Sequence, residues 1–302
     1  MSEIRLQDGL DTMKDSINDK KPKSMYHTEV ECTNEFGEVL FKKSNIILLG
    51  GRRFTLEKLF NITPKDTGRL TLNKILADLK GQSAIAEESY DQEFTSKHGA
   101  GPRKEQCVCL FGVGNGGSAM EFGSLANPVA KESNLYNILP MRYVEEEHKD
   151  DVEETRKYYM HFVNTLADGS KRHAYYLKKF EETPTIKLVV DNGVEYSPVN
   201  ADNNPNYGNS TNSYVLTDDV DAYIEIKLKI SSDDIREYFD ETEGIESSRI
   251  NELALYFGYP ASDDTDVWVD YIGVEAFSKL TFNNEPLTEE SKELNIVYRI
   301  YI

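Results

Sequence analysis

A glycine-rich segment, CLFGVGNGGSA, is the first candidate for chemistry in this sequence. Its Gly112, Gly114 and Gly117 fit the G-x-G-x-x-G spacing that cradles a dinucleotide pyrophosphate after a β-strand. Such a loop binds a cofactor only where its last glycine opens a helix. A second parallel strand must also end in an acidic residue about 20 positions later.

The residues that follow do not meet these requirements. The chain continues SAMEFGSLANPVAKESNLYN, where Gly123, Asn127 and Pro128 leave too little room for a crossover helix. Glu132 lies in a polar stretch, whereas the motif needs its acid at a strand end. We therefore expect no cofactor, and glycines that let the loop turn tightly beside another strand or another chain.

A calcium loop is the next candidate. Asp202, Asn204 and Asn206 follow the D-x-N-x-N spacing, but Tyr207 stands where the loop needs Gly, and Ser213 where it needs a bidentate Glu. We expect an ordinary surface loop here.

A second acidic segment lies nearer the C-terminus, where four aspartates could hold a divalent cation with help from backbone carbonyls. A run of acidic residues more often forms a solvated surface loop, so we expect no metal here. A bound cation stays open as the alternative. The four residues are Asp263, Asp264, Asp266 and Asp270.

Two histidines are candidates for acid–base chemistry. His161 and His173 lie on the two arms of a hairpin expected over 156–182, and no acid or cysteine is obviously placed with them. No nucleophile elbow, H-E-x-x-H, S-x-x-K or P-loop stands in a suitable context. We expect no catalytic residues and no enzyme, although two carboxylates distant in sequence leave no local signature.

Composition restricts the partners. The 302 residues include 34 Lys and Arg against 53 Asp and Glu, a net charge of -19. Such a surface repels phosphate backbones, so we expect no direct binding of nucleic acid. Because the sequence has no apolar stretch of membrane-spanning length and no basic start followed by an apolar run, we expect a soluble chain without a membrane partner.

The three cysteines are Cys32, Cys107 and Cys109. The C-x-C pair lacks the second half of a zinc site. On a strand its two side chains share a face, which favours two small buried apolar groups over a metal pair. This usage is typical of a protein made in a reducing cytoplasm.

The periodicity of the chain predicts a mainly β protein, an antiparallel β-sandwich with an N-terminal helix and hairpin appendage and a few short helices. We expect three parts: 1–80 with the helix, hairpin and short helices, 81–104 as a polar loop or arm, and 105–302 as the sandwich. No internal repeat is visible.

Within the first part, a four-three-four spacing of apolar residues predicts a helix over 4–18. HTEVECTN and EVLFKKSNIILLG predict a hairpin turning at 35–37, closed by Gly50 and Gly51, and short helices follow at 54–60 and near 71–80.

The sandwich is expected to hold strands throughout and one short helix at 233–240. The run from Ala222 to Ile230 alternates apolar and polar residues, which predicts one buried and one wet face. Alternation from Leu294 onward predicts a last strand paired inside the sheet. The adjacent tyrosine pairs at 158–159 and 175–176 would put one ring on each face of the hairpin.

The C-terminal stretch carries a resemblance. A strand with Ile250-Asn251-Glu252, the segment FSKLTF, and Pro286-Leu287-Thr288 before a terminal strand resemble the closing sandwich of virion structural proteins in tailed bacteriophages. GRRFTLEKLF and LFGVGNGG are also similar to pieces of such proteins, especially in large contractile-tailed phages of Gram-positive hosts. The resemblance covers about half the chain and identifies no catalytic residue.

What the resemblance implies is a virion component, made in the host cytoplasm, that forms a homo-oligomeric ring or collar at the neck. It would meet portal, connector and tail subunits there. We expect the Gly112–Gly117 loop and the arms at 81–104 and 197–213 to form contacts. Gly114→Trp is then expected to block assembly while the monomer still folds.

Two alternatives stay open. The chain could instead belong to the baseplate, tail or capsid surface. It could also be a carbohydrate-binding β-sandwich module, with Trp268 and the acidic loop beside it as the site, because tyrosine-rich strands suit protein and sugar surfaces alike.

Overall fold

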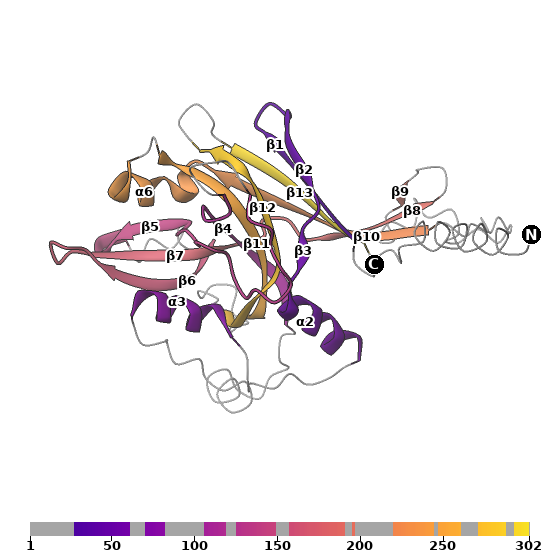
Figure 1. Cartoon of the computed structure of the whole chain (residues 1–302), viewed down its shortest axis with the longest axis horizontal. Coiled ribbons are helices and arrows are strands. Elements are labelled where there is room, and N and C mark those ends of the chain that lie inside the picture. Colours follow the sequence, from indigo (N-terminus) through magenta and orange to yellow (C-terminus); the bar gives the residue numbers. More distant parts are fainter. Residues whose placement is uncertain are drawn as a thin grey trace, which may run out of the picture.

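Two antiparallel β-sheets pack face to face in the computed structural model (Figure 1). The predicted mainly β sandwich is confirmed. The structure describes residues 27–60, 70–81, 106–118, 125–148, 157–190, 195–196, 220–244, 247–260, 271–287 and 293–301.

The first sheet has six strands, with the last strand of the chain near its centre. Val30 and Ile226 both pair with Tyr298, so this last strand is hydrogen-bonded on both sides, as its alternation predicts. In spatial order the strands are β2 (Val39–Lys43), β1 (His27–Asn34), β13 (Glu293–Tyr301), β10 (Val220–Ser231), β8 (Thr185–Val190) and β9 (Glu195–Tyr196).

The second sheet has seven strands and carries the long hairpin of β11 and β12. Strand β7 pairs with β6 along one edge and with β4 and β5 along the other. The strands are β3 (Ile46–Ile47), β12 (Tyr271–Pro286), β11 (Arg249–Pro260), β4 (Cys107–Gly114), β7 (Lys171–Lys179), β5 (Arg142–Glu145) and β6 (Tyr158–Thr165).

Helices line the margins of the sandwich. Helix α3 (Leu72–Lys80) lies on the outer side of the second sheet, helix α2 (Leu49–Leu59) follows β3 at the edge of that sheet with Phe54 packed against the main core, and α6 (Asp233–Thr242) contacts β5 and β10 (Figure 1). A 3-10 turn, η1 (Glu146–His148), follows β5.

The start of α2 corrects one expectation. We expected Gly50 and Gly51 to close a strand, but both lie inside the helix. These positions are glycine because any side chain there would meet β12. A Cβ on Gly50 would lie 2.9 Å from the Ala276 carbonyl oxygen, and one on Gly51 would overlap the Phe277 carbonyl. Glycine therefore lets α2 rest directly on the sheet.

The main core lies between the sheets, where alternate residues of each strand point inward. Tyr158 and Tyr175 face this core while Tyr159 and Tyr176 face the opposite side, so the predicted split of the tyrosine pairs is confirmed. Buried residues of the main core include Val30, Ile226, Leu228, Ile230, Leu294, Ile296, Tyr298, Phe111, Val113, Leu253, Leu255, Phe257, Leu280 and Phe282.

A second core covers the outer face of the second sheet. Leu72 and Leu76 of α3 pack there with Tyr256 of β11 and Ala276 of β12. The second sheet is thus buried on both faces, which explains why β11 is nearly continuous in apolar residues.

The first part of the chain is built into both sheets. The predicted hairpin is confirmed for β1 and β2, with a turn at Gly37, and β1 also pairs with β13. Its second strand is shorter than expected and ends at Lys43. Strand β3 pairs with β12, so this region closes an edge of each sheet. The helix expected over 4–18 and the arms at 81–104 and 197–213 lie outside the described residues.

Leu255→Ala tests the main core. Leu255 is fully buried on β11, so its truncation should lower the free energy of unfolding by about 3 kcal/mol in a urea titration. Ile186→Ala, at a half-exposed position of β8, is the matched control and should change it by less than about 0.5 kcal/mol. Equal losses would contradict this assignment of the core.

Candidate functional site

The glycine-rich loop leaves the end of β4 and runs between β11 and the segment at 136–139. Glu252 of β11 pairs with Gly114 on one side, and Leu139 N donates to the Val113 carbonyl on the other. Ser118 then pairs with Leu125. The prediction that these glycines pack tightly beside another strand is confirmed.

Three of the glycines are required by close backbone contacts, and a Cβ on Gly116 would lie 2.7 Å from the Asn137 nitrogen. A Cβ on Gly114 would overlap the Asn137 carbonyl, and one on Gly117 would lie 2.6 Å from the Asn251 carbonyl oxygen. The expectation that Gly114→Trp would spare the monomer is therefore wrong, because the space beside Gly114 is filled by the chain's own backbone.

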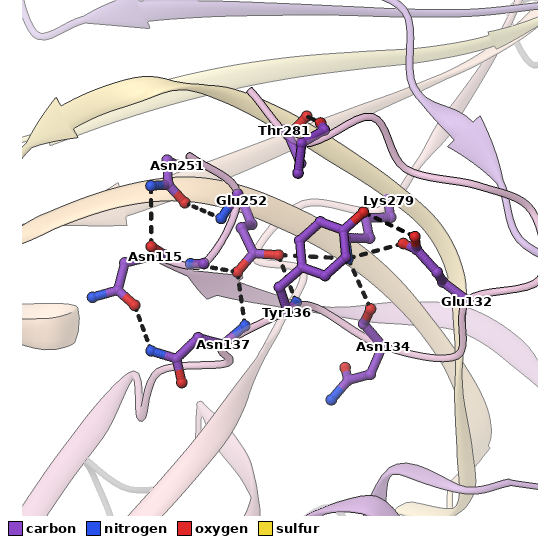
Figure 2. A network of polar contacts seen from close by, with 12 residues as sticks. Asn115, Glu132, Asn134, Tyr136, Asn137, Asn251, Glu252, Lys279 and Thr281 are labelled. Carbon is purple, nitrogen blue, oxygen red and sulfur yellow. Dashed lines mark hydrogen bonds and ion pairs between the residues drawn. The ribbon is translucent and has the colours of Figure 1, made fainter. Parts of the chain in front are cut away.

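The Glu252 carboxylate fastens this loop (Figure 2). One oxygen accepts from Gly116 N at 2.7 Å and Asn137 N at 2.9 Å. The other accepts from Tyr136 N at 2.7 Å. Because Glu252 is fully buried, these amides replace the water that an ionised carboxylate loses on folding.

Lys279 of β12 is the buried cation that faces this carboxylate (Figure 2). Its Nζ lies 3.6 Å from Glu252, 3.1 Å from Glu132, and donates to the Asn134 carbonyl at 3.1 Å. It also sits 3.0 Å from the centroid of the Tyr136 ring. Burial lowers the pKa of Lys279 from its ordinary value, while the two carboxylates oppose that shift.

Amide side chains extend the network along β11. Asn251 Oδ1 accepts from Gly117 N at 2.7 Å, and its Nδ2 donates to the Asn115 carbonyl and to Asn284 Oδ1. Thr281 donates to the Ala126 carbonyl at 2.7 Å. Two loops distant in sequence are thereby tied to one end of the β11–β12 hairpin.

This arrangement is suited to structure. The Glu252 oxygens accept hydrogen bonds from three backbone amides and face the Lys279 ammonium, so they are engaged in holding the chain's own loops. We refer to Glu132, Glu252 and Lys279 with the backbone that they hold as the buried clamp.

Asn251, Glu252 and Lys279 lie in the segments that carry the resemblance, but the sequence alone assigned them no role. The available signal was a charged residue inside an otherwise apolar strand, which implies a buried partner. The partner of Glu252 is Lys279, which lies 27 positions away on the paired strand. The second carboxylate beside Lys279 belongs to Glu132, which lies in a loop. Local spacing cannot reveal such a contact.

The two histidines do meet across the β6–β7 hairpin. His161 Nε2 lies 2.6 Å from His173 Nδ1, and His173 Nε2 lies 2.7 Å from a Glu146 oxygen. The expectation that no acid accompanies them is wrong, because η1 places Glu146 beside the hairpin. The carboxylate accepts from His173, so a neutral His173 accepts from His161 through its other nitrogen.

The cysteine pair lies on β4. Cys107 and Cys109 are both half-buried rather than fully buried, and Cys109 packs against the second core. A hydrogen bond from the Cys109 thiol lowers the pKa of Cys107 to about 7, while that bond and burial raise the pKa of Cys109.

A cleft of about 360 Å³ separates β5 from α6. Three of its carboxylates are paired: Arg142 lies 2.8 Å from Glu237, and Arg172 of β7 contacts Glu241 and Glu145 at 2.7 and 3.0 Å. These ion pairs join the helix to the strand.

The remaining candidates lie outside the described residues. They are Asp202, Asn204, Asn206, Tyr207 and Ser213 of the calcium-like loop, Asp263, Asp264, Asp266 and Asp270 of the acidic run, and Trp268. Within the described ranges, no three His, Cys, Asp or Glu side chains converge as a metal site requires.

Fold and site define an antiparallel β-sandwich protein whose glycine loop is fastened by a buried ion pair. Residues 91–297 match a family of unknown function, DUF7208, and the chain belongs to this family. No curated protein and no solved structure matches the chain. In the described part of the chain, no helix has the length and apolarity needed to cross a membrane.

Glu252→Gln tests the clamp. The substitution removes the charge facing Lys279 and turns an amide group toward a backbone donor, so the free energy of unfolding should fall by about 3 kcal/mol. Chemical denaturation measures the change. Glu182→Gln, which alters the exposed Lys227 pair, should cost less than about 0.5 kcal/mol, and a similarly small loss at Glu252 would refute the clamp.

Gly114→Ala tests the close approach of the loop. The added methyl group meets the rigid Asn137 backbone, so we expect a loss of about 2–3 kcal/mol in thermal or urea unfolding. Gly112→Ala is the matched control and should cost less, since its nearest neighbour is a Leu177 side-chain methyl group and its nearest backbone atom, the Tyr176 carbonyl oxygen, would lie 3.2 Å away. The reverse order would be inconsistent with the contacts described.

Proposed function

We propose that the chain is a structural virion component of a tailed phage, which assembles with copies of itself into a ring or collar at the neck and acts by contact rather than catalysis. The resemblance of its C-terminal stretch to phage virion proteins supports the virion setting. An exposed apolar face on α2 supports the assembly role, and this observation carries the proposal.

Four apolar residues of α2 and its C-cap lie on one side of the helix. At 100° per residue, positions 49, 56, 59 and 60 fall within about a third of a turn. We call Leu49, Leu56, Leu59 and Phe60 the α2 stripe; their exposed fractions are 63%, 50%, 62% and 68%.

The opposite side of α2 already has its partners. Gly51 is buried, and the Phe54 ring packs 4.8 Å from the Phe257 ring and 6.1 Å from the Phe277 ring. The α2 stripe is therefore not the core-facing side of the helix. Single exposed apolar residues are ordinary, but a contiguous apolar face is typical of an interaction site.

The structure beneath the α2 stripe is suited to a protein that acts through a fixed contact surface. Gly51 brings the helix against β12, and the same strand carries Lys279 of the buried clamp. A surface held in this way changes little on binding, which reduces the entropy lost in forming an interface.

Replacing both Leu56 and Leu59 by Ser tests the assembly role. The wild-type chain should self-associate in analytical ultracentrifugation, and the double variant should sediment as a monomer at the same concentrations. Because both side chains are exposed, the free energy of unfolding should change by less than about 1 kcal/mol.

Ile186→Ser, at a half-exposed position of β8, is the control and should assemble like the wild type. A wild-type chain that stays monomeric and is absent from phage particles would contradict the proposed function.

A further inference from the structure

The tip of the β1–β2 hairpin is a second exposed apolar feature. Asn34 Oδ1 accepts from Phe36 N at 3.0 Å and from Glu38 N at 2.9 Å, and Gly37 takes the positive φ that the turn requires. The tip is thus a well-formed turn that projects Phe36, which is 78% exposed. Val39 and Leu40 beside it are exposed as well.

The charges around the two apolar features have opposite signs. Glu35 and Glu38 flank Phe36 and are exposed. Arg52 is exposed on α2, three residues after Leu49 and four before Leu56, so it lies within the α2 stripe.

This complementarity matters because the whole chain carries a net charge of -19. Copies of so acidic a protein repel one another over most of their surfaces. A contact between copies is favoured where a basic group on one meets an acidic group on the next. An α2-to-α2 contact would instead bring Arg52 against its own equivalent.

The two features lie at opposite ends of the molecule (Figure 1). One copy therefore cannot bring its own hairpin tip onto its own α2. Two different patches on each copy make a head-to-tail interface, which produces a closed ring where the rotation between copies closes.

We infer that the β1–β2 hairpin tip of one copy docks on the α2 stripe of the next, with Phe36 against the leucines and Glu35 and Glu38 near Arg52. The inference rests on the proposed function, because it names the partner in self-assembly as a second copy of this chain.

Charge reversal in the full-length chain tests the inference. Glu35→Arg cancels the negative charge of the hairpin tip, because Glu38 remains, and Arg52→Glu gives a copy whose two patches are both acidic. Each variant alone should self-associate at least tenfold more weakly than the wild type in analytical ultracentrifugation. An equimolar mixture of the two should recover association, and so should the double variant.

Two controls separate folding from binding. Lys227→Glu reverses an exposed charge on the outer face of the first sheet and should leave association unchanged. Phe36→Ser should weaken association without altering the charge. Glu35→Arg, Phe36→Ser and Lys227→Glu should keep the wild-type unfolding midpoint, because these side chains are exposed. Arg52→Glu also loses the hydrogen bond from Arg52 Nε to the Ile47 carbonyl, so its midpoint should fall slightly while the chain stays folded.

The outcomes distinguish the inference from the proposed function. If Glu35→Arg and Phe36→Ser associate like the wild type while the α2 stripe variant does not, the hairpin is not the partner and the inference fails, but the assembly role stands. Failure of the mixture and the double variant to recover association also overturns it. A monomeric wild-type chain that is still found in particles overturns the inference and the self-assembly in the proposed function, but leaves the role as a virion component standing.

Discussion

A buried carboxylate facing a buried ammonium is the constraint on which this structure depends. Glu252 and Lys279 lie on paired strands, and neither is exposed. Removing two charges from water is costly unless every oxygen and proton finds a partner. The backbone amides of Gly116, Tyr136 and Asn137 supply partners for the carboxylate, so the loops that carry them are held at one end of the β11–β12 hairpin. Position 114, at the end of β4, must be glycine because the Asn137 backbone comes too close for a side chain.

The same hairpin organises the rest of the sandwich. Strand β12 faces the main core on one side and borders the second core on the other, while α2 rests on its backbone at the sheet edge through the glycine contacts. A sheet buried on both faces needs a covering layer, and α3 provides part of it. The side of α2 that faces away from β12 lies at the surface, which leaves the α2 stripe exposed.

Much of this fold could be predicted from sequence, because strand alternation is local. The alternation gave the correct buried face in β13 and over 226–230 of β10, and Asp168-Gly169 marked the turn of the β6–β7 hairpin. Tyr223, on the face of β10 that was expected to be wet, is buried beside Tyr301 of the neighbouring strand. The start of α2 could not be predicted, since Gly50 and Gly51 are usual helix breakers and only the contact with β12 explains them. The buried clamp and the Glu146–His173–His161 chain join residues from separate elements, so no spacing rule identifies them.

Locating the protein in the phage particle is the most direct test of the account. Antibody raised against the purified chain would be used for immunogold electron microscopy of phage particles from its source. The account predicts gold at the junction of head and tail. Gold at the tail tip would contradict a place at the neck, and particles without any gold would contradict a structural role in the virion.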